Sequence, residues 1–302
     1  MSIEGTFVAM KVVVSGASGC VGHALVPQLL AADHEVIVLS RADVPAALAS
    51  GASTIAADLS RPLPRHQLPA RIDGVVHLAQ GRRYRNFPAA ADEIFAVNVA
   101  ASVDLARYAL DAGARAYAYA SSGSVYVPAR EPLSEDAATA PSNFYTASKL
   151  AAEALLQPFA RHLDVSLLRL FYVYGPRQSG MLADGLAARI VSDTAISLDG
   201  PSGITLAPAF SSDVAAVILR AVTQGWSGVC NVGAQTRIDL KSYAESIGRA
   251  LGKAPKFEIR SEVAPATVLP DLTKLRECCG ALHETPLAEG LALTFANGRN
   301  AT

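Results

Sequence analysis

Two side chains able to exchange a proton lie four positions apart near the middle of the chain. The stretch NFYTASKLAAE, residues 143–153, holds Tyr145 and Lys149 among residues that favour a helix. Positions i and i+4 share one face of a helix, so both side chains can face the same ligand. A phenol ordinarily has a pKa of about 10, and an adjacent ammonium stabilises its phenolate. The spacing predicts a general acid/base pair, with a solvated surface pair as the alternative.

Proton transfer of this kind also needs a hydroxyl that holds the reacting oxygen. The stretch SSGSVY, residues 121–126, offers Ser121, Ser122 and Ser124 at the end of an apolar strand pattern. Serines in such turns often only cap the backbone. We expect Ser121 to belong to the strand end, which leaves Ser122 and Ser124 as the competing candidates.

A glycine-rich turn near the N-terminus predicts dinucleotide binding. The sequence VVVSGASGCVGHAL spaces its glycines as GxxGxxG between an apolar strand pattern and an amphipathic helix pattern. Glycines there allow a tight turn and bring the backbone close to a pyrophosphate, whose charge then faces the helix N-terminus. A simple strand–helix turn is the alternative. The expected cofactor contacts in this turn are Gly16, Gly19, Cys20, Val21 and Gly22.

The end of the second strand pattern indicates which dinucleotide is bound. An NAD-binding site usually offers a carboxylate there, whereas this chain has Ser40 and Arg41. A guanidinium and a hydroxyl suit a 2′-phosphate, so we expect NADP(H), with NAD(H) possible because Asp43 is close in sequence. Asp58, followed by Leu59, could accept a hydrogen bond from the adenine, or could simply cap a loop.

The elements that must position these residues alternate between apolar runs and helical patterns. Strands are expected at 11–15, 35–39, 53–58, 74–79, 116–121 and 165–171, with helices at 21–32 and about 89–112 and another through Tyr145. Such alternation predicts an α/β fold, a Rossmann-type doubly wound parallel sheet. We expect this dinucleotide-binding domain over residues 10–174. Residues 175–302 should form a smaller α/β substrate-binding cap, interleaved with the first domain, with strands at 229–233 and 256–259.

Composition narrows the possible partners. Of 302 residues, 26 are basic and 27 acidic, so no overall field favours nucleic acid or an anionic membrane. No apolar run approaches the roughly 20 residues that span a bilayer. The four cysteines lack metal-ligand spacing, and we expect no metal. A soluble cytoplasmic protein is the expectation.

Taken together, the motifs resemble an extended short-chain dehydrogenase/reductase of the NAD-dependent epimerase/dehydratase family. The resemblance runs over residues 11–295 through GASGCVG, DL, HLA, Asn98, SSGSVY, YTASK, RLFYVYGP and NVG. It implies that Ser122 is the hydroxyl donor and that Lys149 also bonds the nicotinamide ribose. It further implies cofactor contacts from Leu78, Ala79, Asn98 and Tyr172, and a homodimer that includes the helix of Tyr145.

The chain departs from this family where the substrate should bind. Tyr172 replaces the usual Asn before VYGP, Pro208 stands at the position of a pyrophosphate-binding arginine, and Val127 replaces a glycine. Other groups could compensate on loops at the carboxyl ends of the strands, where ligands gather. The candidates for substrate binding are Gln80, Arg82, Arg83, Ser124 and Arg177.

Three hypotheses follow for the function. The first is an NAD(P)-dependent oxidoreductase that acts on a nucleotide-sugar, as a 4-ketoreductase or an epimerase. The departures at Tyr172 and Pro208 favour a second, an NADPH-dependent reductase of a non-nucleotide natural-product ketone. The third is a non-catalytic NADP(H)-binding regulator, which does not require Ser122, Tyr145 and Lys149 together. Substrate, direction and pathway are not written in the sequence.

Overall fold

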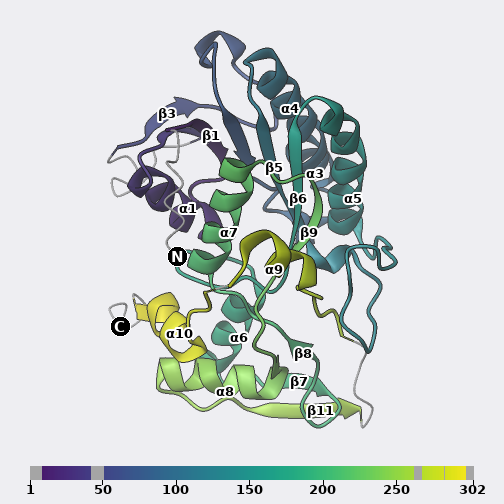
Figure 1. Cartoon of the computed structure of the whole chain (residues 1–302). Helices are drawn as coiled ribbons and strands as arrows, with labels where there is room; N and C mark the ends of the chain where they lie inside the picture. The colour runs from purple at the N-terminus through teal and green to yellow at the C-terminus, as the bar shows by residue number, and fades with distance from the viewer. Residues whose placement is uncertain (1–8, 42–50, 262–266, 282, 297–302) are drawn as a thin grey trace. The chain divides into compact units, whose positions relative to one another are not determined.

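A seven-stranded sheet organises the chain, as a computed structural model shows over residues 9–41, 51–261, 267–281 and 283–296 (Figure 1). Asp43 lies outside these described residues. The strand order is β3-β2-β1-β4-β5-β6-β9, which extends the 3-2-1-4-5-6 order of Rossmann folds by one strand. The strands are β1 (Lys11–Ser15), β2 (Glu35–Ser40), β3 (Ser53–Ala56), β4 (Gly74–His77), β5 (Ala116–Ser122), β6 (Asp164–Leu170) and β9 (Gly228–Val232). The predicted Rossmann-type fold is confirmed.

The last strand of this sheet, β9, comes from the residues 229–233 that the sequence analysis expects in the cap, and it is divided between two units. The chain groups into two compact units, and the first consists of Met1–Ser121, Pro141–Leu168 and Ala215–Val229. The second consists of Ser122–Ala140, Arg169–Val214 and Cys230–Thr302. The predicted boundary at 174 therefore falls inside a segment of the second unit. Strand order depends on contacts between distant segments, which local patterns do not encode.

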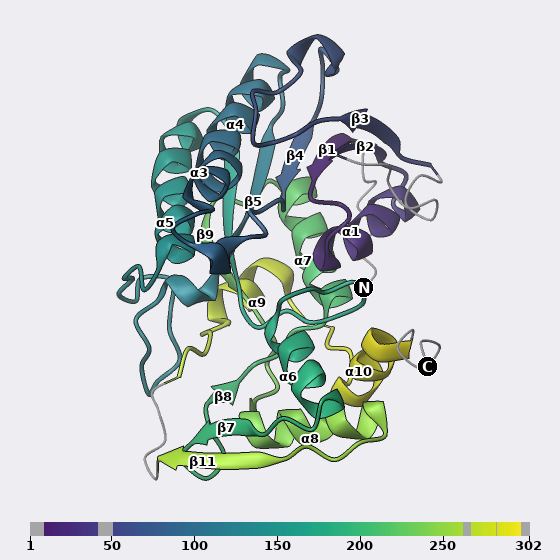
Figure 2. The ribbon, with the colours of Figure 1, turned by 180° about the vertical axis from the view of Figure 1, so that it is seen from behind.

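Helices cover both faces of the sheet within the first unit. Figure 2 shows α3, α4 and α5 on one face and α1 and α7 on the other. Gly74 lies so close to Val222 of α7 that a Cβ there would come within 2.8 Å of its side chain. The bounds of these helices are α1 (Cys20–Ala31), α3 (Ala91–Phe95), α4 (Ala101–Asp111), α5 (Phe144–Leu156) and α7 (Ser211–Gln224), and a π-helical turn (Ala96–Ala100) joins α3 to α4.

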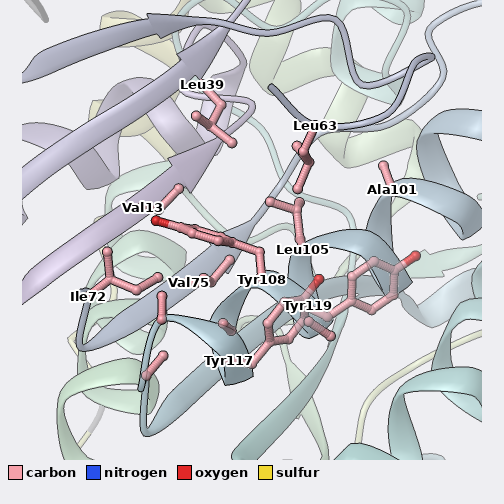
Figure 3. Close-up of a cluster of buried hydrophobic side chains, with 14 of the residues drawn as sticks. Val13, Leu39, Leu63, Ile72, Val75, Ala101, Leu105, Tyr108, Tyr117 and Tyr119 are labelled. Atoms are coloured by element: carbon pink, nitrogen blue, oxygen red, sulfur yellow. The ribbon is translucent and has the colours of Figure 1, made fainter. Parts of the chain in front are cut away.

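The core of the first unit lies between its sheet and the helices α4 and α5. Val13 and Val75 from central strands pack with Leu105 and Tyr108 of α4, as Figure 3 shows. Tyr117 is fully buried beside them and donates its hydroxyl proton to the carbonyl of Ser102. Burying large aromatic residues fixes the strands, provided each hydroxyl finds a partner. This packing fixes β4 and β5, whose ends carry candidate residues.

The second unit has its own small core and two short strand pairs. Parallel β7 (Ile196–Asp199) and β11 (Phe257–Ser261) form one pair, and antiparallel β8 (Thr205–Leu206) and β10 (Ile238–Asp239) form the other. Apolar side chains from α6 (Leu182–Val191), α8 (Leu240–Leu251) and α10 (Leu287–Phe295) meet in this core. The remaining helix is α9 (Thr273–Cys279). None of the helices in the described ranges is long and apolar enough to span a membrane.

Candidate active site

The glycine turn joins β1 to α1 with a geometry that suits a phosphate. Gly16 has a φ of +77°, and a Cβ there would lie 2.6 Å from the backbone nitrogen of Ala79. At Gly22 a Cβ would come within 2.4 Å of the carbonyl oxygen of Gly16. These two glycines let α1 and the end of β4 pack against the turn. Among the described residues, a Cβ on Gly19 would meet only the Gly16 oxygen, at 3.3 Å, so this glycine leaves room for a ligand.

The start of α1 suits an anion in its charge and in the direction of its helix dipole. Gly19 caps the helix without a side chain, and the first turn, which includes Cys20, Val21 and Gly22, has no acidic residue. The first N–H groups of a helix have no partner within it, and the helix dipole favours a negative group there. The described residues of this turn therefore fit the pyrophosphate of a dinucleotide.

The strand ends beside this turn hold the other predicted cofactor residues. Ser40 is half-buried and Arg41 is exposed. Asp58 accepts hydrogen bonds from the backbone and hydroxyl of Ser60, and these bonds are the largest cause of its lowered pKa. The charge of Arg41 also lowers that pKa. Asp58 thus caps its own loop. Leu59 packs in the core, so its side chain is not available to a ligand.

Lys149 is the most deeply buried charged group in this region. Its ammonium nitrogen donates to the carbonyl of Ala120 at 2.8 Å and lies 4.9 Å from the ring centre of Tyr119. The ring centre of Tyr145 lies 5.7 Å from the same nitrogen. Burial lowers the pKa of Lys149 to about 7, although the charge of Glu153 raises it. The solvated surface pair that the sequence left open does not describe a lysine that is 1% exposed.

A capping box explains why α5 begins just before Tyr145. The Asn143 side chain accepts from the backbone of Thr146 at 3.0 Å, and the Thr146 hydroxyl accepts from the backbone of Asn143 at 3.1 Å. Such reciprocal bonds satisfy donors at the first turn and fix where the helix begins. Tyr145 and Lys149 consequently share one face of α5.

The phenol of Tyr145 donates a hydrogen bond to Gln80, a residue predicted only as a substrate contact. The distance from its oxygen to the Gln80 amide oxygen is 3.1 Å, and the Tyr84 ring packs on the Tyr145 ring with centres 5.3 Å apart. Sixty-five positions separate Tyr145 from Gln80, so no local pattern signals this contact.

Asn98 connects the loop of Gln80 to the helix of Tyr145. It is fully buried in the π-helical turn, accepts from the backbone of Gly81 at 2.8 Å and donates to the Ser148 hydroxyl at 2.8 Å. Ser148 in turn donates to the carbonyl of Tyr145 at 2.7 Å. Both polar atoms of the Asn98 amide are therefore used within the protein. Ser148, absent from the predicted residues, forms part of this connection.

Two of the loop arginines contact protein groups. Arg82 donates to the Ser18 hydroxyl of the glycine turn at 3.4 Å, which places it beside the cofactor residues. Arg83 pairs with Glu93 of α3, with a nitrogen–oxygen distance of 2.5 Å. Both arginines are exposed, and exposed pairs of this kind add little stability.

The second unit holds the serine candidates at its first residues. The Ser122 and Ser124 hydroxyls lie 2.7 Å apart, and Ser122 also accepts from the backbone of Ser124 at 3.2 Å. Ser122 therefore caps a short 3₁₀ turn, the structural role that the sequence left open for these serines. Capping does not exclude a role toward substrate, because a hydroxyl can donate and accept at once.

The substrate-side departures also lie in the second unit. Tyr172 has a φ of +44° and Arg177 a φ of +62°, both unusual for residues with a side chain. Burial raises the pKa of Tyr172 to about 12. Pro208 is buried, so its position offers no charge to a pyrophosphate. Arg177 is exposed and remains a candidate for that charge.

The comparisons with known proteins agree with this arrangement. Residues 12–233 match the model of the NAD dependent epimerase/dehydratase family. A UDP-glucose 4-epimerase of Mycolicibacterium smegmatis is 29% identical, over 96% of this chain and 99% of its own length. A UDP-glucuronic acid decarboxylase of Arabidopsis thaliana is 24% identical, over 96% of this chain and 69% of its own length.

Solved structures give the same result. MoeE5 in complex with UDP-glucuronic acid and NAD is 27% identical, with a TM-score of 0.77 over 97% of this chain and all of its own. A UDP-glucuronic acid 4-epimerase from Bacillus cereus, 22% identical with a TM-score of 0.82 over 97% of this chain and 100% of its own, shows the shared fold. The chain thus belongs to the NAD dependent epimerase/dehydratase family of enzymes, as the motifs indicated.

Proposed function

We propose that the chain interconverts UDP-linked sugars that differ at C4, by transient oxidation of the sugar hydroxyl. The observation that carries this proposal is the buried Lys149 ammonium, 5.7 Å from the ring centre of Tyr145. The UDP-glucose 4-epimerase that is 29% identical over almost the whole of both chains supports the substrate class. A bound nicotinamide would accept the hydride and return it to the other face of the same carbon.

The residues of this chain would move and hold the proton. Tyr145, as a phenolate, takes the proton of the C4 hydroxyl as the hydride leaves, and the resulting phenol gives it back when the hydride returns. Lys149 stabilises the phenolate that begins and ends this cycle. The Tyr145 phenol donates a hydrogen bond to Gln80, so the substrate hydroxyl would replace Gln80 as its partner. From the resemblance we assign to Ser122 the hydrogen bond that holds the substrate oxygen.

An assay with two readouts tests this proposal. Incubation with UDP-glucose and NAD⁺ should give UDP-galactose, detected by anion-exchange chromatography, without net accumulation of NADH. Calorimetric titration with UDP, GDP and dTDP reports nucleotide recognition independently of turnover. Absence of binding to all three nucleotides would contradict the proposal.

A reductase of a non-nucleotide ketone is the second candidate. It is supported by the buried Pro208 at the expected arginine position and by Tyr172 in place of an asparagine. This candidate predicts steady oxidation of NADPH by a ketone and no affinity for UDP. The same calorimetric titration therefore separates the two candidates.

The choice of dinucleotide belongs to the same proposal. Arg41, exposed at the end of β2, supports NADP(H), whereas the NAD in the MoeE5 complex supports NAD(H). Fluorescence titration with NADH and NADPH, on the wild type and on Arg41→Ala, measures both affinities. If Arg41 binds a 2′-phosphate, the variant loses affinity for NADPH alone. Equal affinities in the variant and the wild type would leave NAD(H).

We also propose a cytoplasmic homodimer. Leu155 of α5 and Phe95 of α3 expose 48% and 55% of their surface, and apolar side chains on these helices suit an interface. Sedimentation at increasing concentration tests this association, and Leu155→Glu should weaken it. A monomer at all concentrations would contradict it.

A further inference from the structure

A third ionisable side chain follows Tyr145 and Lys149 along the same face of α5. Glu153 comes four residues after Lys149, and only 3% of its surface is exposed. Glutamate is almost never fully buried unless it is paired, because removing its charge from water is costly. The proposed proton transfer uses Tyr145 and Lys149 but gives Glu153 no role.

Glu153 and Lys149 are both hydrogen-bonded to residues of β5. The Ser121 hydroxyl donates to the carboxylate of Glu153, while the Lys149 ammonium donates to the carbonyl of Ala120 at 2.8 Å. Two successive turns of α5 are thus bonded to two successive residues of β5. The two charged side chains therefore follow each other by one turn along the same face of α5, both of them buried.

Two other ionisable groups beside Lys149 carry no charge near neutral pH. Burial lowers the pKa of His77, on β4, to about 3, and burial raises the pKa of Tyr119, on β5, well above its usual value. The third, Tyr145, donates a hydrogen bond to Gln80. Among the described residues whose charge affects the pKa of Lys149, Glu153 supplies the negative charge.

We propose that Glu153 is a positioning residue whose carboxylate is the counter-charge that keeps Lys149 an ammonium beside Tyr145. The proposal rests on the proposed roles of Tyr145 and Lys149 in proton transfer. Removing one partner of a buried charge pair leaves the other uncompensated, and a lysine in that position loses its proton instead. Because burial already lowers the pKa of Lys149 to about 7, little margin remains before the amine becomes neutral.

Nuclear magnetic resonance of lysine tests the charge directly and without substrate. The chain has six lysines, so a protein labelled with ¹³C-lysine gives few signals, and Lys149→Met identifies the one from Lys149. Titration of that signal between pH 5 and 10 should give a midpoint in Glu153→Gln about one to three units below that of the wild type. Glu153→Asp, which keeps the charge, should stay close to the wild-type midpoint.

A matched control changes a carboxylate elsewhere in the same unit. Asp92 is exposed on α3, and Asp92→Asn should leave the Lys149 midpoint unchanged. Equal midpoints in Glu153→Gln and the wild type would overturn the proposal. Because the signal needs no turnover, this result is distinct from a failure of the UDP-sugar assay.

A double variant keeps the proposal testable if Glu153→Gln folds poorly. Lys149→Met leaves the carboxylate without its counter-charge, and Lys149→Met with Glu153→Gln removes both charges. If the two groups compensate each other, the double variant unfolds at a higher urea concentration than additive effects of the single changes predict. Additive effects would overturn the pairing. In the epimerase assay, Glu153→Gln should move the pH dependence of kcat/KM, whereas a merely structural role would lower kcat/KM equally at every pH.

Discussion

Among the described residues, each of the two units contains one fully buried asparagine, and the two residues have different partners. In the first unit Asn98 bonds Gly81 and Ser148, which lie next to Gln80 and Lys149 in the chain. In the second unit Asn231 accepts from the Tyr126 hydroxyl at 2.8 Å and donates to the carbonyl of Leu133 at 2.8 Å. One amide is bonded to the helix of the proposed proton-transfer residues, and the other holds the segment of Tyr126 and Leu133.

The surroundings of the two asparagines differ in the same way. Asn98 bonds Ser148 of α5, and the same helix carries the buried Lys149 and Glu153, the latter bonded to Ser121 of β5. Around Asn231 the ring of Tyr126 lies under the Arg169 guanidinium at 4.6 Å, and Glu135 accepts from the Asn231 backbone at 2.8 Å. In the first unit the buried polar side chains lie next to the proposed reactive residues, whereas in the second they join separate segments of the chain.

The largest expected effect is a loss of catalytic rate from a change in the first unit. Tyr145→Phe removes the hydroxyl that exchanges the proton, and loss of a general acid/base typically costs about 10²–10⁴ in rate. We expect that loss in kcat/KM for UDP-glucose epimerisation, with the calorimetric affinity for UDP unchanged. Undiminished turnover would instead favour the non-catalytic regulator.

Changing the two asparagines compares the units directly. Asn98→Ala and Asn231→Ala each leave buried groups unpaired and should each lower the free energy of unfolding by about 2–4 kcal/mol. Trp226, the single tryptophan, lies in the first unit. Its fluorescence therefore follows urea unfolding of that unit in Asn98→Ala, and circular dichroism follows the loss of secondary structure in Asn231→Ala.

Only one of these variants should disturb the proton-transfer helix. We expect the NMR signal of Lys149 to shift in Asn98→Ala, because Asn98 bonds Ser148 next to it. Asn231→Ala serves as the matched control and should leave that signal in place. A shift in both variants would show that the amides do not act separately.

Local patterns were sufficient for the elements and for part of the site. The strand pattern and the glycine spacing predicted β1, the turn and α1, because each depends on neighbours within a few residues. The pair Tyr145 and Lys149 lies on one helix and was predicted for the same reason. The place of β9 beside β6 was not predicted, since strand order depends on distant contacts.

Contacts across long stretches of sequence account for what the patterns missed. Gln80 was expected to bind substrate, yet it accepts from Tyr145, 65 positions away. Glu153 is not among the predicted site residues, because nothing in the local sequence marks a buried carboxylate on a helix. Only the packing of α5 on β5 places it against Ser121, and no spacing within the sequence encodes that packing.

The pH dependence of the free energy of unfolding tests the lowered pKa of Lys149 in the first unit. The pKa of Lys149 is lowered to about 7 in the folded chain, against an ordinary value of about 10.4. Between these values the unfolded chain binds one proton more, so this group makes stability rise with pH, by up to about 1.4 kcal/mol per unit. The difference in Trp226-detected unfolding free energy between wild type and Lys149→Met, measured from pH 7.5 to 9.5, should show that rise. A constant difference would mean that Lys149 keeps its ordinary pKa.

The smallest effect concerns a strained residue of the second unit. Arg177 is exposed with a φ of +62°, a conformation that costs most residues about 1–2 kcal/mol but that asparagine tolerates better. Arg177→Asn should therefore raise the free energy of unfolding, by about 0.5–1 kcal/mol. Arg130→Asn, at another exposed arginine of this unit that lacks a positive φ, should bring no gain in the free energy of unfolding.

Backbone strain is found where it helps to place a side chain for binding, so Arg177→Asn should also weaken the calorimetric affinity for UDP. A more stable variant with full affinity would remove Arg177 from the substrate-binding candidates and leave its backbone conformation as a feature of the loop alone.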